Sequence, residues 1–381
     1  MGHQATIFTY RHDPVGCYPQ LSREVDIRAV VPYDGSLARV KSHWVWYAAT
    51  VWRRYVIEAR AVARLVQERF DVLNPHERPA HRTAIAVKRK WGRPIVWMHN
   101  DPASWETGYY AESPLPRPLF WLKSKWLRSQ ERKLVRQIDA VTVLDHRVQR
   151  LFQREYGVLP RVVRTGLDKE FLLEPINTDG LRAKLQLPPS SAFILFVGIL
   201  RAHQRVEDLL AAFHILCETK PAARLIILGS PTNAPDYYNF LKAETARLGI
   251  ENNVVFVPRS VSEEDLRAYY RACDIFAFPN EEQTWGLAPL EAMICGKPVV
   301  VSTGAGVHEV LKDRETALLV PPRRPDLIAA AIASLLDDAS MYGRLAVHGR
   351  EFVLRELSWR RYAEQMLAAF QETIAGCVPM G

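Results

Sequence analysis

The sequence predicts an α/β protein of two domains, each built on a largely parallel sheet covered by helices. A chain of 381 residues is longer than one ordinary hydrophobic core organises, and it fits two domains of roughly 150–200 residues each. In the second half, short apolar runs such as 193–198 and 224–229 alternate with segments of helical periodicity, which is typical of a doubly wound parallel sheet. Most of these runs end in Gly, Pro or Ser, which indicates loops at the carboxyl edge of the sheet, where such folds bind ligands.

The first domain, residues 1–175, is expected to be the less regular one. Its strands are expected at 5–10, 26–31, 71–74, 94–98, 139–144 and 161–164. Its helices are expected at 45–69, 81–90 and 119–137. The stretch 171–190 ends in Pro and Ser and is typical of a linker between domains.

The second domain, residues 176–357, carries the clearer alternation. Its strands are expected at 193–198, 224–229, 253–257, 274–278, 298–302 and 317–320. Its helices are expected at 206–219, 235–248, 262–272, 288–295 and 306–311. After residue 324 the pattern is purely helical, and we expect the last helix, 358–375, to pack back on the first domain.

The composition is that of a globular protein, with 48% hydrophobic and 24% charged residues. No apolar run approaches the ~18 residues that span a bilayer, and the first residues lack a signal-peptide pattern, so we expect a cytoplasmic protein. The cysteines have no paired spacing, which favours reduced thiols. His76 and His81 have no third candidate ligand nearby, so no metal site is expected.

Charge is distributed unevenly between the two halves. Residues 1–170 hold 29 lysines and arginines against 17 aspartates and glutamates, a balance of +12, whereas residues 171–381 have a balance of −4. The asymmetry indicates that the first half meets something anionic. None of the common nucleic-acid-binding modules is present, so a phospholipid surface or a phosphate-bearing substrate fits better than nucleic acid.

The most specific pattern is residues 276–310, FAFPNEEQTWGLAPLEAMICGKPVVVSTGAGVHEV. It predicts two consecutive strand-loop-helix corners, one at Gly286 and one passing through Gly304 and Gly306. Backbone N–H groups at helix N-termini suit a diphosphate, and glycine lets the backbone approach phosphate oxygens. A carboxylate such as Glu291 beside these corners is placed to accept hydrogen bonds from ribose hydroxyls. For the two later glycines, a simple turn is the alternative interpretation.

This segment resembles the donor-site signature of the family-4 GT-B glycosyltransferases. The runs 291–293 (EAM) and 296–300 (GKPVV) match the family pattern, in which a first glutamate precedes the second by seven intervening residues. At that first position this sequence has Gln283, with Glu282 just before it. The resemblance implies that Glu291 binds the ribose and that position 283 contacts the donor sugar. Whether Glu282 supplies the missing carboxylate stays open.

A second resemblance lies at residues 196–213, FVGILRAHQRVEDLLAAF. After the strand-end glycine, here Gly198, the family usually has an arginine at the next position and a lysine six positions after the glycine. These cations stabilise the departing nucleoside diphosphate. This sequence has Ile199 and Gln204 instead. We therefore expect Arg205 and, second to it, Arg201 to take over, because guanidinium groups suit phosphate oxygens.

The N-terminal half resembles the family at fewer places. Residues 94–105 match a segment in which a strand ends in a histidine on the acceptor side of the cleft, here His99; a plain polar strand-end residue is the alternative. Gly166 and Asp168 match the family segment that enters the linker. The family opens with a strand, a glycine-rich loop and a helix, and this chain begins at Gly2 as though that first unit were missing.

The resemblance implies a GT-B fold of two Rossmann-like domains facing a cleft, the first strand-loop-helix of the N-terminal one missing. It implies a retaining, metal-independent hexosyltransferase that takes a nucleoside-diphosphate sugar as co-substrate and no cofactor. The acceptor would be a glycan, a lipid-linked molecule or a small molecule, as in polysaccharide biosynthesis. Two alternatives remain open. One is a nucleotide-sugar epimerase of the same architecture, and the other is a non-catalytic nucleotide-binding scaffold.

The residues assigned to chemistry are strand-end and loop residues. As catalytic we assign His99, Arg201, Arg205 and Gln283. As donor-binding we assign Gly198, Glu282, Gln283, Thr284, Trp285, Gly286, Leu287, Glu291, Gly304, Gly306 and Glu309.

Two aromatic segments have alternative interpretations. Residues 118–128, PLFWLKSKWLR, are basic and aromatic and could rest on an anionic membrane surface, making the protein peripheral on the inner face of the membrane. In the alternative, which we favour slightly, the Trp and Leu side chains pack on the sheet while Lys and Arg face water. A second cluster is interpreted as core rather than as a sugar platform: Trp44, Trp46, Tyr47, Trp52 and Tyr55.

Overall fold

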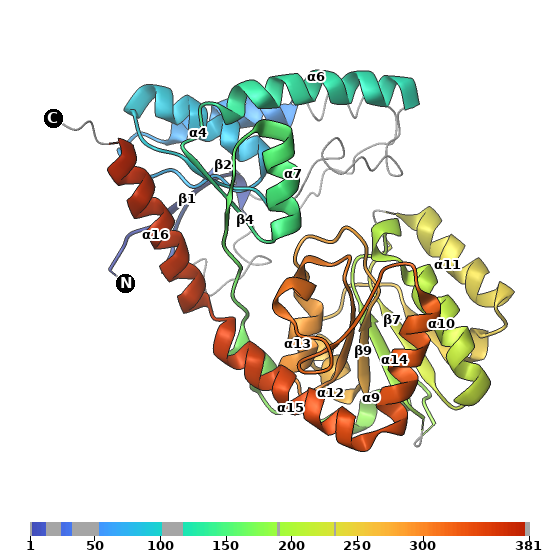
Figure 1. The fold of residues 1–381 in the computed structure, drawn as a ribbon. Helices are drawn as coiled ribbons and strands as arrows, with labels where there is room; N and C mark the ends of the chain where they lie inside the picture. Colours follow the sequence, from blue (N-terminus) through green and yellow to red (C-terminus); the bar gives the residue numbers. More distant parts are fainter. Residues whose placement is uncertain are drawn as a thin grey trace. The chain divides into compact units, whose positions relative to one another are not determined.

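The chain divides into two compact units, drawn in Figure 1. The computed structural model describes residues 2–12, 24–32, 53–100, 117–188, 191–231 and 234–377. Unit 1 comprises Met1–Val143, Val148–Val162 and Gln365–Gly381, and unit 2 comprises Leu144–Arg147 and Val163–Glu364. The chain thus passes into unit 2 ahead of the expected boundary at 175–176, and its last residues belong to unit 1.

Unit 2 is built on a six-stranded parallel sheet with the strand order β11-β10-β9-β6-β7-β8. The strands are β6 (Phe193–Val197), β7 (Arg224–Leu228), β8 (Val254–Val257), β9 (Ile275–Phe278), β10 (Val299–Ser302) and β11 (Leu318–Val320). Most of their residues are buried because helices cover both faces, which explains the continuous apolar runs. The winding reverses between β6 and β9. In doubly wound sheets this switch point is where ligands bind.

The helices of unit 2 begin where local chemistry favours a helix start. α12 (Glu263–Ala272) follows Ser262, whose hydroxyl accepts the backbone N–H of Asp265 at 3.1 Å, and α11 (Pro235–Arg247) has its proline in the first turn. The expected helix at 306–311 is a short 3-10 helix, η4 (Gly306–Val310). The remaining helical segments are α8 (Lys169–Leu173), α9 (Asp179–Lys184), η2 (Ala202–Gln204), α10 (Val206–Thr219), η3 (Glu251–Asn253), α13 (Ala288–Ile294), α14 (Pro325–Asp337) and α15 (Ala339–Glu356).

Unit 1 contains two parallel sheets, and no strand of its described residues joins them. β1 (Thr6–His12) pairs with β2 (Asp26–Pro32), and the second sheet has the order β3 (Val96–Met98), β4 (Ala140–Val143), β5 (Arg161–Val162). The strand expected at 71–74 is reduced to single bridges, such as Leu73 to Ile95. The helical segments are η1 (Arg53–Glu58), a π-helix, α3 (Ala59–Leu65), α4 (Glu77–Trp91), α6 (Arg117–Val135), α7 (His146–Tyr156) and α16 (Trp359–Cys377).

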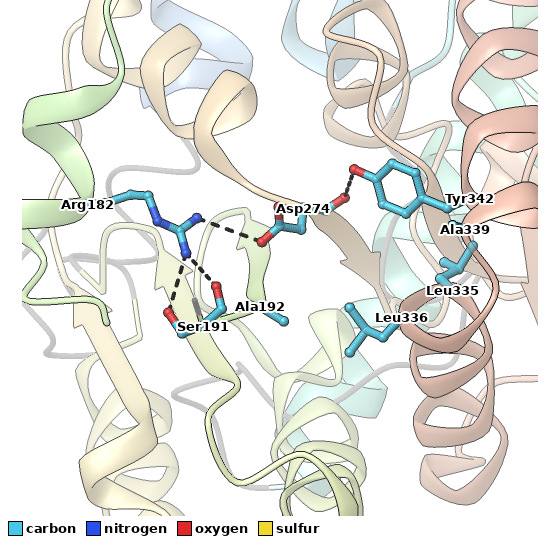
Figure 2. A pocket seen from close by; sticks show the side chains of 8 residues that line it. All are labelled: Arg182, Ser191, Ala192, Asp274, Leu335, Leu336, Ala339 and Tyr342. Carbon is cyan, nitrogen blue, oxygen red and sulfur yellow. Dashed lines mark hydrogen bonds and ion pairs between the residues drawn. The ribbon is translucent and has the colours of Figure 1, made fainter. Parts of the chain in front are cut away.

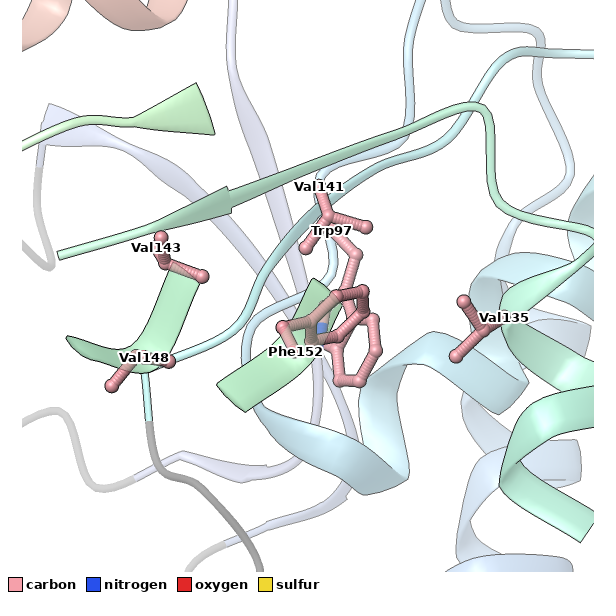
Figure 3. Close-up of a cluster of buried hydrophobic side chains, with 6 residues drawn as sticks. All are labelled: Trp97, Val135, Val141, Val143, Val148 and Phe152. Carbon is pink, nitrogen blue, oxygen red and sulfur yellow. The ribbon is translucent and has the colours of Figure 1, made fainter. Parts of the chain in front are cut away.

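The core of unit 1 lies between α7 and the sheet that contains β3 and β4. Trp97 and Phe152 are fully buried, with ring centroids 5.7 Å apart in an edge-to-face arrangement. Valines from β4, α6 and α7 complete the cluster (Figure 3). Truncating Phe152 to Ala would cost about 3–5 kcal/mol, since a buried aromatic leaves a large cavity. This core holds the end of β3, and with it His99, in place.

Helix α6 does not pack its tryptophans on a sheet. Trp121 and Trp126 are 50% and 62% exposed, and Leu122 is 65% exposed. The packed interpretation of residues 118–128 is therefore wrong for these side chains, whereas the neighbouring Phe120 is buried. Helical spacing places Trp126 opposite the buried stripe of the helix and Trp121 at the edge of that stripe. The aromatic cluster at 44–55 lies outside the part of the chain whose side chains the structure describes.

Candidate functional site

The loops that follow β6 and β9 meet at the switch point of the unit 2 sheet. Gly198 follows β6 directly, and η2 continues this loop; the loop after β9 runs through residues 279–287. The two are joined through their backbones, since the N–H of Glu281 donates to the carbonyl oxygen of His203 at 2.8 Å. Several of the residues that the sequence assigned to a donor site are thus brought together at the expected edge of the sheet.

Three amide side chains connect these two loops. The Nδ2 of Asn280, which is completely buried, donates to the Oε1 of Gln204. The Nε2 of Gln204 donates in turn to the Oε1 of Gln283 at 3.1 Å and lies 3.1 Å from the Nε2 of His203. Two of the three positions at which the sequence departs from the family pattern, 204 and 283, are therefore partners of each other. An uncharged amide pair stands where the family has a lysine and a glutamate.

Glu291 extends from the first turn of α13 and is largely buried. Its Oε2 accepts the hydroxyl of Tyr270 at 2.6 Å, and among the described residues its Oε1 has no hydrogen-bond partner. Burial raises the pKa of the Glu291 carboxyl, and the hydrogen bond from Tyr270 offsets part of that rise. Burial and the nearby carboxylate also raise the pKa of Tyr270 well above its ordinary value, so its hydroxyl stays a donor. Glu291 is thus fixed through one oxygen and can accept through the other.

The loops after β9 and β10 both pack closely against a buried carboxylate, Asp145. The backbone N–H of Trp285 donates to Asp145 Oδ2 at 3.2 Å. A Cβ added to Gly306 would lie 2.4 Å from the same oxygen, so only glycine fits there. A Cβ added to Gly304 would similarly lie 2.8 Å from the backbone carbonyl oxygen of Asn280. Both glycines therefore have a packing role in addition to any contact with a phosphate.

Glu309 is held by backbone and side-chain donors. Both of its carboxylate oxygens accept the N–H of His146, at 2.9 and 3.0 Å, and Oε2 lies 3.2 Å from a guanidinium nitrogen of Arg164. A donor ligand would have to compete with these partners. The position that the sequence assigned to donor binding therefore also anchors residues 146 and 164 within unit 2.

The expected cations flank η2. Arg205, in the left-handed region at φ 52°, precedes α10, and its guanidinium pairs with Asp208 at 2.6 Å and with Glu207 at 2.7 Å. Burial lowers its pKa, but these carboxylates outweigh burial and raise it. Arg201 lies at the other end of η2, half-buried. Ile199, where the family has an arginine, is an exposed apolar side chain.

Four other assigned residues belong to the loop after β9. Gly286 has φ 110°, and a Cβ there would lie 2.9 Å from the ring of Phe278, so glycine is required. The indole of Trp285 is buried, which leaves it no surface for a ligand in this conformation. Thr284 is half-buried and accepts the Nε2 of Gln283 through its carbonyl oxygen, and Leu287 is exposed.

Glu282 is the exposed acid of that loop. Partial burial of its carboxyl and the nearby charge of Glu281 raise the pKa of Glu282, and Arg147 offsets part of that rise. Arg147 also donates to the carbonyl oxygen of Glu282 at 2.8 Å. Glu282 is next to Gln283 in sequence. Among the described residues, however, its carboxylate makes no contact with Gln283.

Two family profiles divide the chain between them. The profile "Glycosyltransferase Family 4" matches residues 1–171, and the profile "Glycosyl transferases group 1" matches residues 177–352. The chain belongs to the family-4 glycosyltransferases. The two profiles meet at the linker that the sequence predicts, and the second covers every unit 2 residue of the site except Asp145, His146, Arg147 and Arg164.

Relatives of this glycosyltransferase carry a common description. D-inositol 3-phosphate glycosyltransferase of Corynebacterium glutamicum is 29% identical over 318 residues, covering 80% of this chain and 73% of the relative. The protein of the same name from Segniliparus rotundus is 28% identical, covering 81% of this chain and 67% of the relative.

Solved structures share the fold at low identity. Anabaena HepE in complex with UDP and glucose has a TM-score of 0.74 and 18% identity, covering 96% of this chain and 91% of that chain. Sucrose-phosphate synthase of Thermosynechococcus elongatus has a TM-score of 0.70 and 21% identity, covering 84% of this chain and 77% of that chain. The glycosyltransferase therefore has the GT-B fold of two Rossmann-like domains, as the sequence predicts.

His99 lies in unit 1, at the end of β3. The side chain of His99 is buried, and its backbone N–H donates to the carbonyl oxygen of Thr142 at 2.9 Å. The centroid of its ring lies 4.8 Å from the ring centroid of Trp97 and 5.1 Å from that of Phe152. The glycosyltransferase thus packs this histidine among aromatic rings of the unit 1 core. Its role toward an acceptor stays a prediction.

A cavity of about 570 Å³ in unit 2 lies at the other edge of the sheet (Figure 2). Arg182 faces Ser191 and Asp274 there, just before β6 and β9 begin, and Tyr342 donates to the carbonyl oxygen of Asp274 at 2.9 Å. The cavity contains none of the residues assigned to chemistry. Among the described residues of the glycosyltransferase, no group of three or more potential metal-ligating side chains is present.

Sequence reasoning missed several residues of the site, among them Asp145, Asn280 and Tyr270. Asp145 lies two residues after the end of β4, and its position just beyond a buried strand is a signal that could have found it. Asn280 stands inside the motif but was not singled out. Tyr270 lies in α12, where helical periodicity gives no indication that its hydroxyl reaches Glu291.

Proposed function

We propose that this glycosyltransferase takes its sugar from a nucleoside-diphosphate sugar bound at the carboxyl edge of the unit 2 sheet. The observation that supports this most is the meeting of Gln204, Asn280 and Gln283 at the switch point between β6 and β9. Doubly wound sheets bind nucleotides at that place. An amide donates and accepts at once, and so does a sugar hydroxyl, so this lining suits a sugar. We assign the donor sugar to Gln283.

The ribose is assigned to Glu291. Tyr270 holds one oxygen of its carboxylate and fixes the direction of the other, which can accept from a ribose hydroxyl. A hydrogen bond to a charged group contributes about 1.5–3 kcal/mol, enough to decide whether a nucleotide binds tightly. The raised pKa of Glu291 adds a condition, because the carboxyl must be ionised to accept through both oxygens.

The charge of the leaving diphosphate is assigned to Arg201 and Arg205. Arg205 is already paired with Glu207 and Asp208, so a phosphate would share its guanidinium with these carboxylates or displace one of them. The guanidinium becomes more valuable as the bond to the sugar breaks, because negative charge on the diphosphate grows in the transition state. With two guanidinium groups in this role, we propose that transfer needs no divalent cation.

The reaction is a hexosyl transfer with retention of configuration. The bond between the sugar C1 and the diphosphate oxygen breaks, a bond from C1 to an acceptor oxygen forms on the same face, and the proton of the acceptor hydroxyl passes to an oxygen of the leaving diphosphate. Relatives are described as acting on D-inositol 3-phosphate. That description and the +12 balance of residues 1–170 support an acceptor that carries both hydroxyl and phosphate groups.

The test is release of nucleoside diphosphate from UDP-, GDP- and ADP-glucose by the full chain, with and without inositol phosphates. We expect release of nucleoside diphosphate from the donor of one nucleotide only, at a rate that EDTA does not change. NMR of the product should show that the α-configuration of the transferred sugar is kept. Glu291→Gln should lower release, and Glu264→Gln, an exposed acid on α12, should not. Binding without release from any donor would favour the non-catalytic scaffold, and release that requires a divalent cation would contradict the metal-free mechanism.

A further inference from the structure

Helix α6 has a buried stripe and an opposite stripe that nothing in the described structure covers. Phe120, Ser124, Glu131 and Val135 are buried, at the spacing of one helix face. The opposite stripe begins with three apolar side chains at helical spacing: Leu119, Leu122 and Trp126. They are 54%, 65% and 62% exposed. Figure 1 shows α6 running along one side of unit 1. Large apolar side chains gathered on an exposed face mark an interaction site.

The exposed face of α6 is also free of acidic groups. Its sequence, RPLFWLKSKWLRSQERKLV, has six basic residues and one acid, Glu131, which lies on the buried stripe. There Glu131 faces Arg78 at 3.3 Å and His81 at 3.5 Å. Every charge that α6 presents to solvent is therefore positive.

The basic residues of α6 have two different roles. Arg128 and Arg132 pair with Glu155 of α7 and hold the helix on unit 1. Lys125 and Lys133 are exposed, with no ion-pair partner among the described residues; Lys125 lies beside the apolar stripe and Lys133 lies two turns beyond Trp126 in line with it. The cations that anchor the helix are thus separate from those that face outward.

We propose that α6 is a docking face for an anionic lipid bilayer. Trp126, Leu122 and Leu119 enter the boundary between headgroups and acyl chains, while Lys125 and Lys133 reach the lipid phosphates. An apolar stripe flanked by cations is what an interfacial helix needs, and a tryptophan ring suits the headgroup level. A second copy of this chain fits less well, because two such faces would bring like charges together.

This surface goes beyond the proposed function and does not depend on it. The lipid contact involves only unit 1, whereas the donor site lies in unit 2. Docking would place the glycosyltransferase at the surface where lipid-linked or headgroup acceptors are found. A single interfacial helix gives reversible binding, so the protein is expected to exchange between membrane and solution.

The test is sedimentation of the full chain with vesicles of pure phosphatidylcholine or of phosphatidylcholine with about 30 mol% phosphatidylglycerol. We expect binding to the anionic vesicles that weakens with added salt but does not vanish, because the apolar contact is not screened. Each basic residue near an anionic surface contributes about fivefold, so Lys125→Gln with Lys133→Gln should lower the partition coefficient about 30-fold at low salt. Leu122→Ser with Trp126→Ser should remove the part of the binding that survives high salt.

Matched controls come from α11 in unit 2, which exposes Phe240 and Lys242. Phe240→Ser and Lys242→Gln should leave vesicle binding unchanged. All of the replaced side chains are exposed, so thermal unfolding of each variant should match the wild type. Absence of binding to anionic vesicles at low salt would overturn the proposal. Equal binding by the α6 variants and the wild type would also overturn it, and a dimer that Trp126→Ser dissociates would assign the face to a second copy.

Discussion

If Gln204, Asn280 and Gln283 act as one unit, replacing either glutamine should disturb the other. Gln204→Ala removes the acceptor of the Asn280 amide, whose Oδ1 already has no partner among the described residues. The Nδ2 of a completely buried amide would then also be unpaired, which costs about 1–3 kcal/mol of unfolding free energy. Gln283→Ala removes two hydrogen bonds of a half-buried residue, one from Gln204 and one to the carbonyl oxygen of Thr284, and should cost about 1–2 kcal/mol.

The combination of the two substitutions is the sharper measurement. Once Gln204 is gone, its bond to Gln283 no longer exists, so Gln283→Ala should cost less in that background. We expect the double variant to fall short of the sum by about 1 kcal/mol, measured as the free energy of unfolding in urea at fixed m-value. Additive single effects would refute the interpretation of the amides as a coupled unit.

Placing the family's glutamate at position 283 and its lysine at position 204 tests whether the two positions are partners. Gln283→Glu alone replaces a donor to the carbonyl oxygen of Thr284 with an acceptor, so we expect a loss of about 1–3 kcal/mol. Adding Gln204→Lys supplies an ammonium beside that carboxylate, and the Asn280 amide can turn its unpaired oxygen toward it. The double variant should recover most of the lost stability. If it is less stable than either single variant, the two positions are not partners.

Three further substitutions address single residues. Glu291→Gln should weaken nucleotide-sugar binding about tenfold yet raise the unfolding temperature at neutral pH, because a carboxyl whose pKa is raised by folding stabilises the protein fully only below its unfolded pKa. The gain in stability should shrink as the pH falls toward the ordinary carboxyl range. A gain that does not depend on pH would contradict the raised pKa of Glu291. Arg205→Ala should lower turnover more than donor affinity, and equal losses in both would show a role in binding alone. Gly306→Ala should cost at least about 2 kcal/mol because its Cβ would meet Asp145, whereas Gly343→Ala, with open space around it on α15, should be neutral or stabilising; equal stability of the two variants would contradict the close packing.

Much of the unit 2 fold follows from local signals. Its six strands are buried on both faces, so each appears as a continuous apolar run, and the turns between them are marked by Gly and Pro. Position 283 and Glu291 were singled out because the motif fixes their spacing along one loop and one helix, and their roles stay predictions. The pairing of Gln204 with Gln283 could not be predicted in the same way. Nothing local connects two glutamines in loops that follow different strands.

The failures have physical reasons of the same kind. For the tryptophans of α6, the basic and aromatic pattern leaves open whether the side chains pack inward or face outward. We favoured inward packing, and in the structure they are exposed. The expected helix at 306–311 is only a 3-10 turn, where the loop closes around the buried Asp145. Both outcomes depend on tertiary neighbours, which periodicity along a chain does not contain.

We propose that unit 2 binds a nucleoside-diphosphate sugar through Glu291 and the amide unit of Gln204, Asn280 and Gln283. Thermal unfolding of the wild type with UDP-, GDP- and ADP-sugars measures this directly, since a ligand at 100 times its Kd adds about 2.7 kcal/mol of stability. We expect one nucleotide to raise the unfolding temperature of the wild type, and the same concentration to have a much smaller effect on Glu291→Ala. No shift with any of the three donors, or an equal shift in the variant, would contradict the account.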